Sequence, residues 1–207
     1  MFGRREQKQQ EKEIMKILPV PYYSQNAESV DSDWRNRACG ISCISMVMAY
    51  HQLDDVSIMP LINEGLNIGG YCANGWFHES LVRIMRNHGL HAYAEEYKCV
   101  TIGKDRGVFH ENVLQPKMIE SGILKIIKQI DLDRPVIVSV DEKFRDNKFK
   151  HIVVIVGYKT SVNKITGFYI NDPDDRESPG SNIFISIDRF KDYWRKFAIF
   201  ARNLDTI

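Results

Sequence analysis

Four cysteines and six histidines are the residues of this sequence best suited to nucleophilic chemistry, since a thiolate attacks and an imidazole moves protons. Cys39 lies where the polar stretch DSDWRNRA meets CGISCISMVMAYH, a run with helical spacing. A helix N-terminus favours a thiolate because its free N–H groups and dipole stabilise the anion. We expect Gly40 to let a substrate backbone approach the sulfur. Cys39 is therefore the candidate nucleophile, against the alternative of a small buried apolar residue.

The other three cysteines have weaker claims to chemistry. Cys43, one turn after Cys39, should point into the core, and Cys72 and Cys99 lie in loop-like stretches. The sequence has no CxxC spacing, and four cysteines are too few for a disulfide scaffold. A metal site built from Cys39, Cys43 and a histidine is the remaining, minor alternative.

The general base is sought among the histidines, and His151 is the preferred candidate. It opens the strand-like run HIVVIVGY, so it can face a cleft while the strand holds its backbone, unless it faces solvent at a strand edge. Asp172 closes GFYIND, and Pro173 favours an extended conformation there. In antiparallel neighbours the start of one strand lies beside the end of the other, so Asp172 would orient His151. An Asp-Pro turn is the plainer interpretation of Asp172, and His78 in GWFHES is the other histidine kept in view.

Gln25, at the end of VPYYSQ, is the fourth candidate. A glutamine amide beside a thiol can donate a hydrogen bond to a developing oxyanion. A glutamine in a loop usually only contacts solvent, so the prediction that Gln25 belongs to the site depends on the motifs around it.

The elements that must position these residues are helices first and strands later. Helical spacing predicts helices over 39–51 and about 77–88, and a third from Pro116 with an isoleucine stripe. Short β-branched runs predict strands at 135–140, 151–158, 167–172 and 183–187, the middle two joined as a hairpin. Residues 98–115 lack periodicity and are predicted to be a surface loop or lid. The pattern predicts an α+β domain with two lobes.

Composition bounds the class of protein. The 207 residues are 43% apolar and carry 28 basic against 27 acidic side chains, which fits one globular domain and gives no support to nucleic-acid binding. No run reaches the roughly 18 apolar residues of a membrane-spanning helix, and no signal-peptide core follows the first charges. We expect a charged, flexible arm over 1–16, a single domain over 17–207, and a cytoplasmic protein with reduced thiols.

Four strings in order carry a family resemblance: VPYYSQ, W..RACGISCISMVMAYH, HIVVIVGY and FYINDP. Together they resemble the C39-like cysteine peptidases of the papain-like superfamily, over roughly 18–194, and DRFKDYWRKF resembles the closing helix of that family. The resemblance implies a papain-like fold, with a helical lobe carrying Cys39 and an antiparallel sheet carrying His151 and Asp172. It also implies that Gln25 shares the oxyanion hole with the Cys39 N–H.

The implied activity is hydrolysis of a peptide or amide bond through a thioester, with a peptide or protein as substrate and no metal or organic cofactor. Two alternatives stay open: a silent peptide-binding module of the same fold, and an acyl or amide transferase acting on a small thiol peptide. The sequence departs from the family at Cys43, where Ser or Ala is usual, and matches only loosely over 63–115. The exporter branch of the family is fused to a transporter, so a double-glycine leader is not assumed as substrate.

Overall fold

The computed structural model describes residues 13–53, 57–99, 104–146 and 149–204, with the backbone alone for 104–113. Five α-helices, one short 3-10 helix and nine strands occur in these ranges. The helices are α1 (Cys39–Tyr50), α2 (Ile58–Asn67), α3 (His78–Asn87), α4 (Lys104–Asp131), η1 (Glu142–Phe144) and α5 (Ile187–Tyr193). The strands are β1 (Glu13–Ile17), β2 (Tyr71–Cys72), β3 (Gly75–Trp76), β4 (Leu90–Glu96), β5 (Val136–Asp141), β6 (Lys150–Ser161), β7 (Lys164–Asn171), β8 (Ile183–Ser186) and β9 (Trp194–Asn203).

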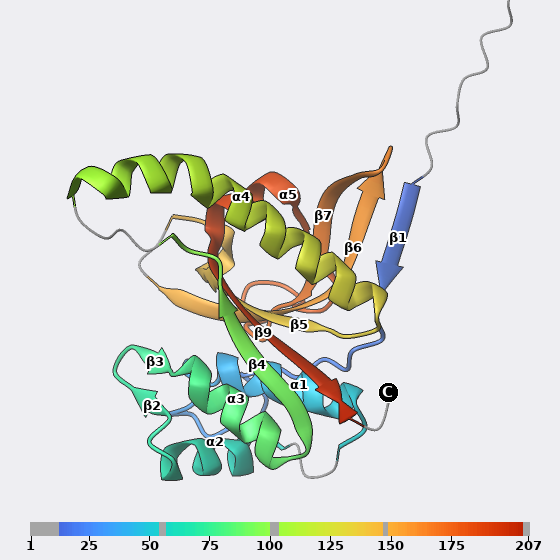
Figure 1. Cartoon of the computed structure of the whole chain (residues 1–207). Helices are drawn as coiled ribbons and strands as arrows, with labels where there is room; N and C mark the ends of the chain where they lie inside the picture. The colour runs from blue at the N-terminus through green and yellow to red at the C-terminus, as the bar shows by residue number, and fades with distance from the viewer. Residues whose placement is uncertain (1–12, 54–56, 100–103, 147–148, 205–207) are drawn as a thin grey trace, which may run out of the picture.

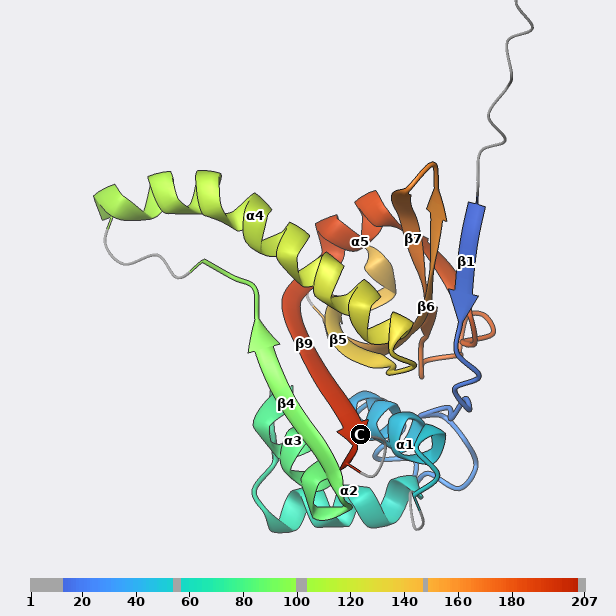
Figure 2. The same ribbon diagram turned by 45° about the vertical axis from the view of Figure 1, so that its right-hand side comes forward.

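The strands form one large antiparallel sheet in the order β4-β9-β5-β6-β7-β8, and β2 and β3 form a separate hairpin. Strand β6 is the longest and has three partners: β5 along its first half, β1 along its second half, and β7. Figures 1 and 2 show α1, α2 and α3 together on one side of β5 and β9, with α4 and α5 on the other side. This is the predicted α+β arrangement of a helical lobe and an antiparallel sheet.

Strand β6 is buried from His151 to Tyr158. A continuous apolar run of this kind suits a strand that is covered on both faces. The turn between β6 and β7 places Val162 and Asn163 at φ +50° and +62°, the left-handed conformation that a tight hairpin needs. The predicted hairpin is therefore confirmed, although the register of β6 against β7 shifts between Ile155 and Gly157 and between Lys159 and Thr160.

Helix α1 is the centre of the helical lobe, and every residue from 40 to 48 is buried. A Cβ atom at Gly40 would lie 3.0 Å from a methyl carbon of Leu81 and 3.3 Å from one of Ile152. The glycine is thus needed for close packing of α1 against α3 and β6. The expectation that Gly40 leaves room for a substrate backbone is wrong, because its free side faces the core.

Three other local predictions need correction, and some elements were not predicted. Residues 104–115 are helical, not a loop, because α4 begins at Lys104 and continues through Pro116 to Asp131. The last four residues of the predicted arm, 13–16, belong to β1, which gains backbone hydrogen bonds by pairing with β6; residues 1–12 lie outside the described part. The segment 188–197 is helical only to Tyr193, after which β9 begins. Helix α2, the β2–β3 hairpin and β4 were not expected from the pattern.

None of the helices in the described ranges combines the length and the apolar character that a bilayer crossing requires.

Candidate active site

Cys39 is the first residue of α1, and contacts on both sides hold it there. The Trp76 indole Nε1 donates a hydrogen bond to the Arg37 carbonyl oxygen over 2.7 Å, which fixes the preceding loop. Ala38 is fully buried, whereas Cys39 is only partly buried. The first turn of α1 contains no acidic side chain to oppose the positive end of its dipole. The thiol therefore lies at a helix N-terminus with access to solvent.

His151 is the second residue of β6 and is 4% exposed. Its Nε2 lies 2.6 Å from Oδ1 of Asp172, and the Cys39 thiol lies close enough to the ring to raise the pKa of His151. Since Nε2 contacts the carboxylate, Nδ1 is the ring nitrogen left for the sulfur. Burial alone would lower the pKa of His151, but the hydrogen bonds and charges of Asp172 and Cys39 outweigh it and raise the pKa to about 10. The arrangement therefore favours a protonated imidazole.

Asp172 follows the last residue of β7, and the chain folds back to hold it. Its amide donates to the Gly180 carbonyl oxygen over 2.7 Å, and the Tyr22 hydroxyl donates to its own carbonyl oxygen over 3.0 Å. A Cβ at Gly180 would overlap that same carbonyl oxygen and the Tyr22 ring, so the return of the loop requires a glycine. The Asp174 amide donates to Asp172 Oδ1 over 2.9 Å, which orients the carboxylate toward the imidazole.

Gln25 is 3% exposed and belongs to the same cluster through its backbone. Its amide donates a hydrogen bond to the Pro173 carbonyl oxygen over 2.9 Å, so the Gln25 backbone is anchored one residue from Asp172. The side-chain Oε1 is buried and has no hydrogen-bond partner among the described residues. A buried amide that is incompletely bonded costs stability, and such groups are retained most often where function needs them.

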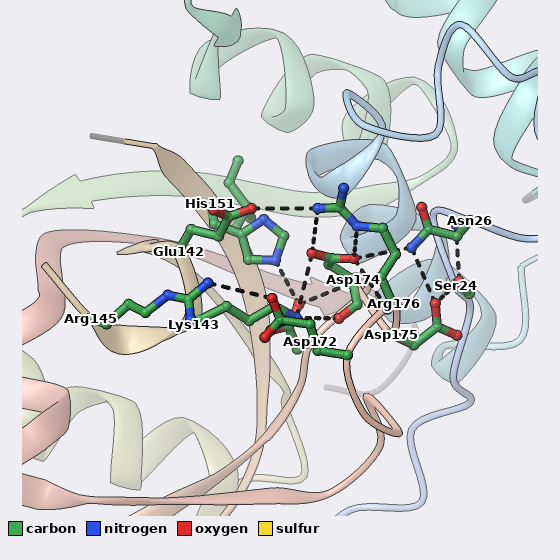
Figure 3. Close-up of polar contacts among 12 residues, drawn as sticks. Ser24, Asn26, Glu142, Lys143, Arg145, His151, Asp172, Asp174, Asp175 and Arg176 are labelled. Atoms are coloured by element: carbon green, nitrogen blue, oxygen red, sulfur yellow. Dashed lines mark hydrogen bonds and ion pairs between the residues drawn. The ribbon is translucent and has the colours of Figure 1, made fainter. Parts of the chain in front are cut away.

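A network of charges around the buried Asp174 was not expected from the sequence (Figure 3). Its centre is the Asp174 carboxylate, whose Oδ1 accepts from Arg176 Nε over 2.7 Å and whose Oδ2 accepts from Arg176 Nη2 over 2.8 Å. The same Oδ1 accepts from Asn26 Nδ2 over 3.2 Å, and Arg176 Nη1 donates to Asn36 Oδ1 over 2.9 Å. These bonds tie the loop after β7 to the neighbours of Gln25 and to the loop before Cys39. The run of acids in DPDD was the signal that could have suggested such a network.

A pocket of about 360 Å³ opens beside Cys39. One wall comes from the helical lobe and includes the β2–β3 hairpin, and the other comes from Phe149 and Lys150 at the start of β6. The lining carries aromatic, amide and cationic side chains and, in the described part of the chain, no carboxylate. Phe149 is 68% exposed, which is unusual for a large apolar side chain. The lining residues are Asn36, Arg37, Cys39, Tyr71, Ala73, Asn74, Gly75, Trp76, Phe149 and Lys150.

The remaining thiols and His78 have other surroundings. Cys43 is fully buried and its Sγ donates to the Ile152 carbonyl oxygen over 3.2 Å, and burial above all raises the pKa of its thiol. Nε2 of His78 lies 2.6 Å from Ser139 Oγ, and its ring stacks on Phe197 at 3.9 Å. Burial lowers the pKa of His78. The described residues contain no group of three or more His, Cys, Asp or Glu side chains placed to hold a metal ion.

A helical lobe and an antiparallel sheet, meeting at a cysteine on a helix N-terminus and a histidine on a strand, define the papain-like fold. A sequence model of the Peptidase_C39-like family matches residues 17–199, and the chain belongs to that family. Family and fold together support a peptidase-type function.

Solved structures of C39 peptidase domains share this fold at low sequence identity. A C39-like protein from Bacillus anthracis superimposes with a TM-score of 0.60 at 17% identity, covering 91% of this chain and 98% of the other. A double glycine motif protease from an AMS/PCAT transporter, in complex with its leader peptide, gives 0.54 at 18% identity, with 91% and 94% covered. The peptidase domain of Streptococcus ComA, a bi-functional ABC transporter, gives 0.53 at 18%, with 91% and 98% covered. No curated protein sequence matches the chain.

Proposed function

We propose that this protein is a cysteine peptidase that hydrolyses a peptide or amide bond through a thioester on Cys39. The observation that carries the proposal is the contact of the Asp172 carboxylate with the His151 imidazole, whose pKa is raised by Asp172 and by the nearby Cys39 thiol. This contact lies at a helix N-terminus and beside a pocket that both lobes line. Each of these features alone has a structural explanation, but together they meet the requirements of an activated nucleophile.

The proposed reaction begins with the Cys39 thiolate attacking the carbonyl carbon of the scissile bond. The carbonyl oxygen becomes an oxyanion, which the Cys39 backbone N–H and the Gln25 side-chain amide would stabilise. His151, protonated in the ion pair, gives its proton to the departing amine as the C–N bond breaks. Asp172 keeps the imidazole in the tautomer and orientation that this transfer needs.

The resulting thioester is then hydrolysed by water. Neutral His151 takes a proton from the water as its oxygen attacks the acyl carbon, and the tetrahedral intermediate collapses with release of the Cys39 thiolate. The imidazole and the thiolate end in their starting forms, so no external oxidant or cofactor enters the cycle. An amine acceptor in place of water would turn the same chemistry into transfer, the alternative that product analysis distinguishes.

The substrate is proposed to be an extended peptide or protein segment. The pocket beside Cys39 is lined by both lobes, and its aromatic and amide side chains suit a peptide backbone with an apolar side chain. The structural neighbour from the AMS/PCAT transporter is bound to a leader peptide. This similarity supports peptides as the substrate class and does not single out a leader sequence.

Cys39→Ala used as a trap in lysate tests the proposal, with bound peptides identified by mass spectrometry and offered to the wild-type protein. We expect cleavage by the wild type and a loss of at least about 1,000-fold in kcat with Cys39→Ala. Cys43→Ala is the matched control, because it removes a thiol one turn away that has no contact with the imidazole. Full activity of Cys39→Ala would refute the assignment, and binding without cleavage by the wild type would favour the peptide-binding module.

A further inference from the structure

Lys143, in the short helix η1, places its ammonium group directly behind the catalytic carboxylate. Its Nζ lies 3.7 Å from Asp172 Oδ2 and 3.4 Å from Asp174 Oδ2, and it donates a hydrogen bond to the Asp174 carbonyl oxygen over 2.6 Å. The Lys143 side chain is only 15% exposed, and the two carboxylates are 4% and 1% exposed. A lysine is rarely so buried without paired charges, and here it has two.

The backbone at Lys143 is strained in a way that delivers this side chain. Lys143 and Phe144 have φ +57° and +49°, the left-handed region that residues with a Cβ rarely adopt. The strained turn is anchored by the Phe144 ring, which is 2% exposed. It is anchored also by Arg189, whose Nε donates to the Phe144 carbonyl oxygen over 3.0 Å. Strain that the surroundings hold in place is found most often at functional sites.

The charges around Lys143 come from several elements. Asp172 and Asp174 are negative and buried, and Arg176 pairs with Asp174 from the solvent side. Apart from the His151 imidazolium, Lys143 is the cation that pairs with Asp172 among the described ion pairs. The other ionisable groups of this neighbourhood come from several elements: Glu142 on η1 and Arg145 just after it, Tyr22 and Asp175 beside the loop after β7, His151 on β6, Cys39 and Cys43 on α1, and Arg189 on α5.

We propose that Lys143 is a positioning residue of the catalytic site, acting through Asp172: its ammonium group offsets the negative charge of the buried carboxylates and so sets the pH range over which Cys39 and His151 exist as an ion pair. The inference rests on the proposed Cys39–His151 pair. It assigns a role to a residue that lies outside the reacting groups and touches only the carboxylates and backbone behind them.

Electrostatics gives the sign of the effect. A cation near the pair stabilises the Cys39 thiolate and destabilises the His151 imidazolium. Its removal should therefore raise both pKa values, the one at which the ion pair forms and the one at which the imidazolium loses its proton. A charge removed at this range through a partly buried medium shifts each by about one pH unit. A variant that only loosened the fold would lower the rate of reaction at Cys39 without raising both pKa values together.

The test measures alkylation of Cys39 by iodoacetamide from pH 4 to pH 10, with the modified residue identified by mass spectrometry. This readout needs no peptide substrate. We expect the alkylation rate of the wild type to change in two steps, one where the ion pair forms and one where the imidazolium loses its proton. In Lys143→Met both steps should lie about one pH unit higher. Lys143→Arg keeps the charge and should keep the wild-type profile. Arg145→Met is the matched control, since it removes a cation from the same turn that pairs only with exposed Glu177.

Asp174→Asn is a second variant that keeps the inference testable if Lys143→Met does not fold. It removes one negative charge beside Lys143, so both steps should move downward. Unmoved steps in Lys143→Met or in Asp174→Asn overturn the role of Lys143, even with an active wild type. A single step near pH 8.5 in the wild type, as for an ordinary thiol, overturns the ion pair and this inference with it. Displaced steps without any peptide cleavage would support Lys143 and count against the peptidase proposal alone.

Discussion

Asp172→Asn is the perturbation that most directly probes the proposed site. Asparagine has nearly the shape of aspartate but no charge, so the 2.6 Å contact with His151 Nε2 loses its ionic component. A carboxylate in contact with a histidine contributes about 1 to 3 pKa units. We therefore expect the pKa of His151 in the variant to fall by about two units from its raised value, which corresponds to about 2.7 kcal/mol of lost stabilisation of the imidazolium.

The assay is the pH profile of kcat/KM on a peptide that the wild type cleaves. The alkaline limb reports loss of the imidazolium proton, so it should move down by about two pH units. As a result, kcat/KM should fall by about 50-fold at pH 10 but by only about twofold at pH 8. Asp175→Asn is the matched control: Asp175 lies in the same loop, but its carboxylate accepts bonds from Ser24 and Asn26 and not from the imidazole. An alkaline limb at the same pH in Asp172→Asn and wild type would refute the reasoning.

The same substitution makes a prediction about folding stability. The pKa of His151 is raised in the folded protein, to about 10, above its ordinary value near 6.5. The stabilisation from this shift is therefore fully present below about pH 6.5 and is lost as the pH rises toward 10. Denaturant unfolding should show a larger difference between wild type and Asp172→Asn at pH 6 than at pH 10. A difference that grows with pH would contradict the assigned direction.

Three further substitutions separate the site from its surroundings. Cys43→Ala should keep the rate of Cys39 alkylation and cost about 1 to 2 kcal/mol in denaturant unfolding, because it leaves a small cavity. Gly180→Ala should lower kcat by about tenfold, with a fall in Tm, because its Cβ would push on the Asp172 carbonyl. Phe149→Ala should raise KM several-fold with little change in kcat or Tm, since its ring is exposed beside the pocket. An unchanged KM would mean that this ring does not contact substrate.

The strands that carry the candidate site could be predicted because their signals are local. HIVVIVGY is an uninterrupted apolar run with a histidine at its start, and GFYIND ends at a proline, so both strands and their hairpin follow from sequence. Antiparallel pairing then places His151 beside Asp172 without any knowledge of the rest of the chain. The structure has this proximity, and the catalytic roles stay a prediction.

The parts that could not be predicted depend on distant contacts. Helix α4 begins twelve residues before Pro116, although a proline usually indicates the first turn of a helix. The sequence of its first turns also lacks the regular spacing of apolar residues that predicts a helix. Strand β9 follows α5 directly and is stabilised by pairing with β4 and β5 rather than by local propensity. Lys143 and Asp174 come together only because a strained turn meets the loop after β7.

The pairing of β1 with the second half of β6 determines where the chain before residue 13 leaves the folded domain. Glu13 pairs with Ser161, ten residues along β6 from His151, which corresponds to roughly 30 Å of strand. A tag, a surface linker or a fluorescent protein joined directly before Glu13 would therefore start that far along β6 from His151. Glu13 is thus a suitable attachment point for immobilising the described domain with the pocket beside Cys39 open to peptides.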